Sequence, residues 1–292
     1  MRKGIILAGG NGSRLSPITN AISKQLVPVY DKPLIYYPLS CLIMAGIKEI
    51  LIISSALHLP SFKRLFGTGA HLGLELHYEV QGKPNGIGEA YIIAEKFLNK
   101  EPSALILGDN IFYGNDLKEK FKAASNNMDI NTIITHHVAK PERYGVISLD
   151  NEESIIDIIE KPISAPSPYA ITGFYFLDEY AVEHAKQLTV SKRGELEITE
   201  LLKKYLRSNN LRDVRLGRGS VWFDAGTVES LLDASNFIQS IKHRHGLMIA
   251  CPEELAYREG LVNLQQLTDL ANSQSNPDIK NYLLKIVEID TV

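Results

Sequence analysis

Short runs of apolar residues alternate with segments of helical spacing through the first third of the chain. Gly4–Ala8, Glu49–Ser54 and Ala104–Leu107 are dominated by apolar residues, which is typical of strands buried on both faces of a parallel sheet. Leu74–Val80 predicts one more strand. The spacing of apolar residues between these strands predicts helices over residues 33–45, ending at Gly46, over 60–66 and over 88–98. This order of elements predicts a doubly wound α/β fold with a mostly parallel, twisted sheet.

The pattern changes after residue 127. Four strands with short turns are predicted over residues 131–138, 144–149, 154–160 and 171–177, which indicates antiparallel additions to the parallel sheet. Helices are predicted over 178–188, 197–207 and 227–243, and short strands over 214–216 and 220–223. Further helical segments follow in 252–292, separated by the polar stretch 272–277. With no repeat and no Pro/Gly linker, we expect one domain over residues 1–240 and a C-terminal helical extension over 241–292 packed on it.

The composition is that of an ordinary soluble globular protein. The chain has 292 residues, 45% of them hydrophobic, and a net charge of −3. This charge argues against a nucleic-acid-binding surface, and no apolar run reaches the length of a membrane span. Lys3 and Gly9 interrupt any signal-peptide pattern, so we expect a cytoplasmic protein. Cys41 and Cys251 lie in apolar surroundings and are interpreted as reduced, buried thiols rather than a disulfide or a metal pair.

A glycine-rich segment follows the first predicted strand. Its glycines are Gly9, Gly10 and Gly12, and the cations Arg14 and Lys24 follow them. Backbone N–H groups of such a loop can point at phosphates, and the two cations can neutralise them. The spacing does not match a dinucleotide fingerprint, because Leu15 stands where the third glycine is needed, and it lacks the Gly-Lys-Ser/Thr of a P-loop. A plain glycine turn between strand and loop is the alternative.

Two segments carry a specific resemblance. GIILAGGNGSRL from Gly4 and SKQLVPVYDKP from Ser23 resemble the sugar-nucleotide pyrophosphorylases, most closely the glucose-1-phosphate thymidylyltransferases. The resemblance runs from Met1 to about Phe237 and more loosely to the C-terminus. It implies a Rossmann-like nucleotidyltransferase fold and transfer of a thymidylyl group from dTTP to glucose 1-phosphate, giving dTDP-glucose and pyrophosphate. It also implies a homotetramer, a regulatory nucleotide site at a subunit interface, and a first step towards dTDP-sugars such as dTDP-rhamnose for cell-surface polysaccharides.

Two aspartates are candidate metal ligands. Asp109 follows the predicted strand that ends at Leu107, and Asp224 follows Val221-Trp222-Phe223. Two carboxylates brought together at strand ends form a hard-oxygen site for Mg²⁺. For each aspartate alone, capping of a turn is the more frequent role. The family's patterns, GDN for the first and W-x-D-[TA]-G-T for the second, are both present and imply the metal site.

The resemblance assigns the remaining contacts to two groups of residues. Those that contact the nucleotide are Leu7, Gly9, Gly10, Gly12, Arg14, Lys24, Gln81, Gly86 and Asp109. Those that contact the sugar phosphate are Asn110, Tyr144, Gly145, Glu160, Lys161, Ile171, Thr172, Arg193 and Trp222. Catalysis is expected from Arg14 and Lys24 on the leaving pyrophosphate, and from Lys161 and Arg193 on the sugar phosphate. Considered alone, Lys161 and Arg193 are interpreted as solvated surface charges.

The sequence departs from the family near the residues expected to contact the base. Asn85-Gly86-Ile87-Gly88-Glu89 replaces the more usual Asp-Gly-Leu-Ala-Gln, Ser13 replaces threonine, and Ile171 stands where valine is usual. Three other functions are weighed against the thymidylyltransferase. They are a sister pyrophosphorylase that uses UTP or another sugar phosphate, a non-catalytic sensor of sugar nucleotides, and a dehydrogenase, which the glycine spacing disfavours.

Overall fold

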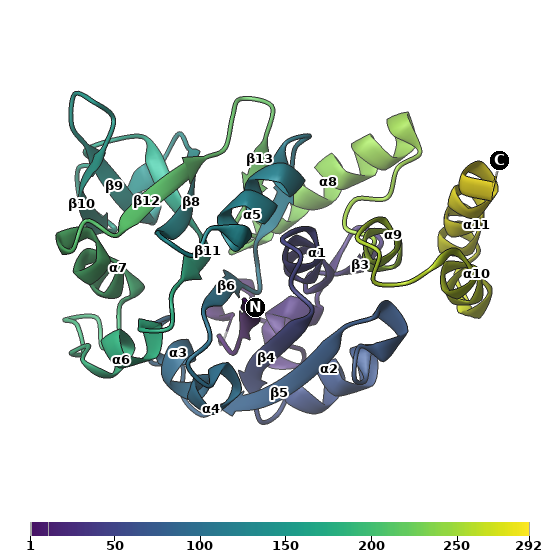
Figure 1. Ribbon diagram of the computed structural model, residues 1–292, viewed down its shortest axis with the longest axis horizontal. Helices are drawn as coiled ribbons and strands as arrows, with labels where there is room; N and C mark the ends of the chain where they lie inside the picture. Colours follow the sequence, from purple (N-terminus) through teal and green to yellow (C-terminus); the bar gives the residue numbers. More distant parts are fainter. Residues whose placement is uncertain (1, 11, 292) are drawn as a thin grey trace.

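The computed structural model describes residues 2–10 and 12–291 and is built around a nine-stranded mixed sheet (Figure 1). Its parallel part runs in the order β6-β1-β4-β5. The bounds of these strands are Ser103–Leu107 (β6), Lys3–Ala8 (β1), Glu49–Ser55 (β4) and Glu75–Gln81 (β5). All four predicted strands of the first half are therefore confirmed, each within two residues of the predicted bounds.

The antiparallel part of the sheet begins at β11 (Tyr169–Leu177), which pairs with β6. β8 (Asn131–His137) and β9 (Gly145–Leu149) are both antiparallel to β11, and β10 (Ile155–Glu160) is antiparallel to β9. The predicted antiparallel additions are confirmed. The strand predicted over 214–216 is longer, as β12 (Leu211–Arg215), and it runs parallel to β8.

The continuous apolar runs are explained by helices on both faces of the sheet. Ile6, Ile50 and Ile106 pack with α1 (Tyr36–Met44), α2 (Leu59–Phe66) and α5 (Leu117–Asn126). Ile5, Leu51 and Leu105, the alternate residues, pack on the opposite face, since successive side chains of a strand point to opposite faces. The helices there are α3 (Glu89–Ile93), α4 (Glu95–Leu98), α6 (Ala181–Lys186) and α7 (Ile198–Arg207).

Two small pairs of strands lie outside the main sheet. The hairpin of β2 (Pro28–Val29) and β3 (Lys32–Pro33) corrects the helix predicted over 33–45, which begins only at Tyr36 because Lys32 and Pro33 pair with β2. Gly46, at φ 77°, follows the end of that helix as predicted. The second pair joins β7 (Ile111–Tyr113) to β13 (Val221–Phe223), bringing segments distant in sequence together.

The C-terminal part is helical, as predicted. α8 (Val228–His245) starts with a capping box between Thr227 and Ser230. It is followed by α9 (Pro252–Arg258), α10 (Leu264–Ser273) and α11 (Pro277–Thr291), with α10 and α11 at the edge of the molecule (Figure 1). α10 and α11 share a small core that also includes Met248 and the buried Cys251, which precedes α9. The predicted domain boundary at 240/241 falls within α8 and stays a prediction; Cys41 and Cys251 are both free and buried, as expected.

Candidate active site

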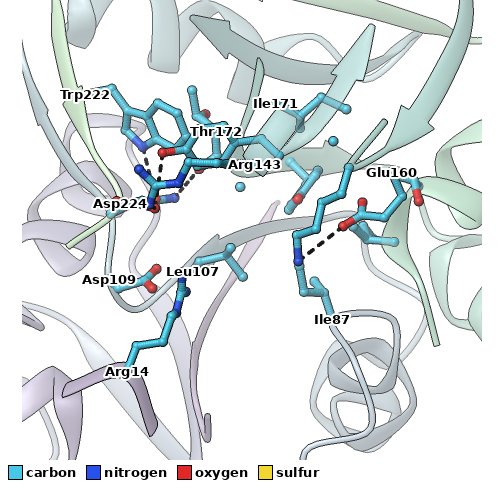
Figure 2. A pocket seen from close by; sticks show the side chains of 18 residues that line it. Arg14, Ile87, Leu107, Asp109, Arg143, Glu160, Ile171, Thr172, Trp222 and Asp224 are labelled. Atoms are coloured by element: carbon cyan, nitrogen blue, oxygen red, sulfur yellow. Dashed lines mark hydrogen bonds and ion pairs between the residues drawn. The ribbon is translucent and has the colours of Figure 1, made fainter. Parts of the chain in front are cut away.

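A cavity of about 410 Å³ opens where β1 and β6 end, the edge of an α/β sheet at which ligands bind (Figure 2). Among the predicted site residues, the structure brings eleven together around it: Arg14, Asp109, Asn110, Tyr144, Gly145, Glu160, Lys161, Ile171, Thr172, Trp222 and Asp224. The others do not line it: Leu7, Gly9, Gly10, Gly12, Lys24, Gln81, Gly86 and Arg193. Two of these nevertheless contact residues that line it: Lys24 forms an ion pair with Asp109, and Arg193 donates a hydrogen bond to Glu160.

The glycine loop and its cations lie beside Asp109. Gly12 has a φ of 59°, and a Cβ there would approach Thr19 Cγ2 to 2.8 Å, so the loop requires glycine at this position. Asn11 lies outside the described residues. Lys24 is buried, and its Nζ lies 2.5 Å from Oδ2 of Asp109. The segment after the glycine loop thus places one cation directly on the first candidate metal ligand.

Asp224 faces the same cavity from the end of β13. Its Oδ2 accepts hydrogen bonds from Tyr144 Oη at 3.2 Å and Arg143 Nη2 at 3.3 Å. Burial, and then the nearby Asp224 carboxylate, raise the pKa of Tyr144 to about 12, so Tyr144 stays a hydrogen-bond donor at neutral pH. In the view of Figure 2, Asp224, Asp109 and Arg14 lie across the cavity from Glu160.

The carboxylates of Asp109 and Asp224 are of the type that would hold a magnesium ion if substrate phosphates and water supplied the other ligands. Mg²⁺ is usually bound by one or two carboxylates together with substrate phosphates and water. Asp109 and Asp224 line one cavity, and among residues 2–10 and 12–291 no cluster of three or more His, Cys, Asp or Glu could hold a metal by itself. An ion bound here would therefore need oxygens from phosphates or water.

Hydrogen bonds fix the wall formed by the segment after β6 and by β11 and β13. Asn110 is buried, and its Nδ2 donates to the carbonyl of Thr172 at 2.6 Å. Its Oδ1 accepts from Trp222 Nε1 at 3.1 Å. The Trp222 ring packs on Tyr144, with the ring centroids 5.0 Å apart. This wall contains aromatic rings, which can pack on the face of a sugar ring, and an amide, which can form hydrogen bonds with sugar hydroxyls.

Glu160 and Lys161 form the opposite wall. Lys161 Nζ lies 3.7 Å from Glu160 Oε1, and its backbone has a φ of 44°. Arg193 lies outside the cavity and donates from Nη1 to Glu160 Oε1 at 3.0 Å. Burial lowers the pKa of Arg193, but the hydrogen bond to Glu160 and the charge of Glu197 outweigh it, and the net shift is upward. The structure therefore places Arg193 behind Glu160.

Gln81 and Gly9 lie against each other at the ends of β5 and β1. A Cβ on Gly9 would lie 2.0 Å from Gln81 Oε1, so only glycine leaves room for this amide. Gln81 is buried, and its Nε2 donates to Glu89 Oε2 at 2.7 Å. Gly86 has a φ of 103°, and a Cβ there would lie 2.6 Å from the carbonyl oxygen of Leu196.

Sequence reasoning missed several residues that line the cavity. Arg143, Tyr175 and Thr199 lie among them. Arg143 directly precedes Tyr144, and a cation beside a predicted sugar-contacting residue was a signal that could have found it. Burial raises the pKa of Tyr175 well above its usual value. Neither Tyr175 nor Thr199 belongs to a motif, so only the fold reveals them.

Comparison with known proteins identifies the family of this chain. Residues 3–241 match the family described as nucleotidyl transferase. The chain belongs to this family. The nucleotidyl transferase match ends within α8, before the small C-terminal core.

Relatives with a common name extend the match to nearly the whole chain. The chain is 47% identical to a glucose-1-phosphate thymidylyltransferase of Xanthomonas campestris pv. campestris (strain B100), over 98% of this chain and 97% of the relative. It is 44% identical to a protein of the same name from Mycobacterium tuberculosis (strain ATCC 25618 / H37Rv), over 98% and 99%.

Solved structures of nucleotidyl transferases share the fold. A candidate glucose-1-phosphate thymidylyltransferase from Bacillus anthracis, in complex with a sucrose, has a TM-score of 0.75 at 38% identity, covering 81% of this chain and 95% of that one. A UDP-glucose pyrophosphorylase complexed with UDP-glucose has a TM-score of 0.73 at 27% identity, covering 82% and 99%. The predicted fold class is confirmed. Across the described helices, none is long and apolar enough to cross a membrane.

Proposed function

We propose that this chain is an enzyme that transfers a thymidylyl group from dTTP to glucose 1-phosphate, releasing dTDP-glucose and pyrophosphate. The proposal is carried by the near-full-length identity of 44–47% to proteins named for this activity. The cavity supports it, because two carboxylates and Arg14 line it together with a wall of aromatic and amide groups. Lys24, on Asp109, adds a second cation at the same edge.

The reaction is a direct displacement at phosphorus. A phosphate oxygen of glucose 1-phosphate forms a bond to the α-phosphorus of dTTP, and the bond from that phosphorus to the β-phosphate oxygen breaks. The nucleophile is already an anion, so no general base is needed. Catalysis is then positioning and charge stabilisation. The reaction breaks one phosphoanhydride bond and forms another, so its free-energy change is expected to be small and the reaction readily reversible.

Cations of the chain offset the repulsion between the two substrates. Arg14 and Lys24 lie near the glycine loop and are assigned to the leaving pyrophosphate, while Lys161 on the opposite wall is assigned to the sugar phosphate. Asp109 and Asp224 are assigned to a Mg²⁺ ion. When bound, the ion would neutralise developing charge on the phosphates.

Glu160 is assigned to the sugar hydroxyls. Its hydrogen bond from Arg193 at 3.0 Å supports a role of Arg193 in orienting this carboxylate. Direct contact of Arg193 with the sugar phosphate stays a prediction. So do the homotetramer and the place of the product as a precursor of dTDP-sugars such as dTDP-rhamnose.

The experiment is product detection. The purified chain, incubated with dTTP, glucose 1-phosphate and Mg²⁺, is expected to release pyrophosphate and dTDP-glucose in equal amounts. Added pyrophosphate and dTDP-glucose are expected to regenerate dTTP. Binding of dTDP-glucose without pyrophosphate release would instead identify a non-catalytic sensor and refute the proposal.

A further inference from the structure

The carboxylate of Glu89 is a hydrogen-bond acceptor for three donors. Its Oε2 accepts from Gln81 Nε2 at 2.7 Å and from the backbone N–H of Asn85 at 3.2 Å, and its Oε1 accepts from Asn85 Nδ2 at 2.7 Å. An ionised carboxylate has no hydrogen to donate. Every group that faces Glu89 must therefore present a hydrogen to it.

The segment that carries Asn85 and Glu89 is anchored at the cavity. Leu196 N–H donates to the Asn85 carbonyl at 2.6 Å, and Gly88 N–H donates to the Leu196 carbonyl at 3.0 Å. Ile87, between these two residues, lines the cavity and is labelled in Figure 2. Glu89 thus follows a backbone segment that two hydrogen bonds hold to Leu196.

This arrangement gives the amide of Gln81 one direction. Its NH₂ faces Glu89, and its Oε1 is directed to the glycine loop, where it occupies the space of an absent Gly9 side chain. Turning the amide over would set Oε1 against Oε2 of Glu89 at the 2.7 Å now spanned by a hydrogen bond. Two oxygens without a hydrogen between them repel each other, and Gln81 is buried, so water does not relieve the cost.

We propose that Glu89 is a positioning residue that fixes the direction of the Gln81 amide and so makes the site select a base with an imide N–H. The inference rests on the proposed function, in which Gln81 contacts the base of dTTP. With Oε1 directed to the base, Gln81 accepts the N3–H that thymine and uracil share, and the second hydrogen of Nε2 is available to a neighbouring carbonyl. Cytosine presents an unprotonated N3 and an amine, which match only the reversed amide.

The test compares three variants by their kcat/KM for dUTP and dCTP with glucose 1-phosphate. Glu89→Met keeps the length and removes the acceptor, so the Gln81 amide can turn over. The ratio of kcat/KM for dUTP to kcat/KM for dCTP is expected to fall by roughly 10- to 150-fold, which is the factor that one charge-assisted hydrogen bond contributes. Part of this fall is expected to come from a higher kcat/KM for dCTP, which a general loss of structure would not produce.

Glu89→Gln keeps the shape of the side chain and one acceptor oxygen but removes the negative charge. The backbone N–H of Asn85 cannot turn over and still requires an oxygen at the Oε2 position, so the glutamine is expected to keep most of the discrimination. Glu95→Met serves as the matched control, because Glu95 is exposed on α4 and forms an ion pair with Lys186 at the surface. This control is expected to keep the wild-type ratio and activity.

The outcomes distinguish the inference from the function on which it rests. A wild-type chain that does not use dTTP refutes the proposed function itself. If the wild type uses dTTP but Glu89→Met keeps the wild-type ratio, or loses dUTP and dCTP equally, Glu89 does not orient the amide. Equal losses of discrimination in the Gln and Met variants would likewise overturn the proposal.

Discussion

Gly9→Ala tests whether the contact between the glycine loop and Gln81 forms the base site. The added Cβ would lie 2.0 Å from Gln81 Oε1, whereas real Cβ contacts essentially never fall below 3.0 Å, so the two atoms must separate by about 1 Å or more. We expect Gln81 to move, because the contacting atom is at the tip of its side chain, whereas Gly9 belongs to the backbone that directly follows β1.

The size of the effect follows from the hydrogen bond that this movement breaks. Gln81 Nε2 lies 2.7 Å from Glu89 Oε2, and a displacement of about 1 Å takes such a pair out of hydrogen-bonding range. A hydrogen bond to a charged group contributes about 1.5–3 kcal/mol, or roughly 10- to 150-fold in an equilibrium or rate ratio. We expect kcat/KM for dTTP to fall by this factor.

The assay is the initial rate of pyrophosphate release at varied dTTP and saturating glucose 1-phosphate. Gly82→Ala is the matched control, since Gly82 directly follows Gln81 and a Cβ there meets no atom within 4 Å. Gly82→Ala is expected to behave as the wild type, and both variants are expected to keep the Tm within a few degrees. An unchanged kcat/KM for dTTP in Gly9→Ala would show that the buried amide of Gln81 is not part of the nucleotide site.

Two further predictions concern the phosphates. Asp109→Asn and Asp224→Asn keep the shape and remove the charge, so kcat at saturating Mg²⁺ is expected to fall by roughly 10²–10³ or more with little change in Tm, and retention of more than about half of kcat in either variant would rule out the two-carboxylate site. Lys24→Ala is expected to impair mainly the use of dTTP and Lys161→Ala mainly that of glucose 1-phosphate, each by roughly 10- to 150-fold in kcat/KM; the reverse pattern would exchange the two assignments.

Local patterns predicted most of the sheet but not the pairing of distant segments. The runs of β1, β4 and β6 are buried on both faces, and their composition alone indicates this. The pairing of Phe112 with Trp222 joins segments more than a hundred residues apart, and no local signal encodes it. The helix α5 was missed although Leu117, Phe121 and Ala124 are buried on one face of it.

In the candidate site too, the sequence predicts residues that belong to motifs but not the contacts that the fold creates between distant segments. Gly12, Lys24 and Asp109 belong to motifs, and the structure places Lys24 directly on Asp109. The partners of Asp224 could not be predicted, because Arg143 and Tyr144 reach it from the loop before β9. Sequence reasoning noted the change from Asp and Gln to Asn85 and Glu89, but the hydrogen bond from Gln81 to Glu89 depends on how β5 meets α3.

An initial-rate matrix of nucleoside triphosphates against sugar 1-phosphates tests the proposed substrate pair. We expect the highest kcat/KM for dTTP with glucose 1-phosphate. The kcat/KM for dUTP is expected to be lower by only about 4- to 100-fold, because one buried methyl group distinguishes the two bases, and that for dCTP is expected to lie far below both. A higher kcat/KM for UTP than for dTTP, or equal values for dCTP and dUTP, would contradict the proposed use of dTTP and the proposed contact of Gln81 with the base.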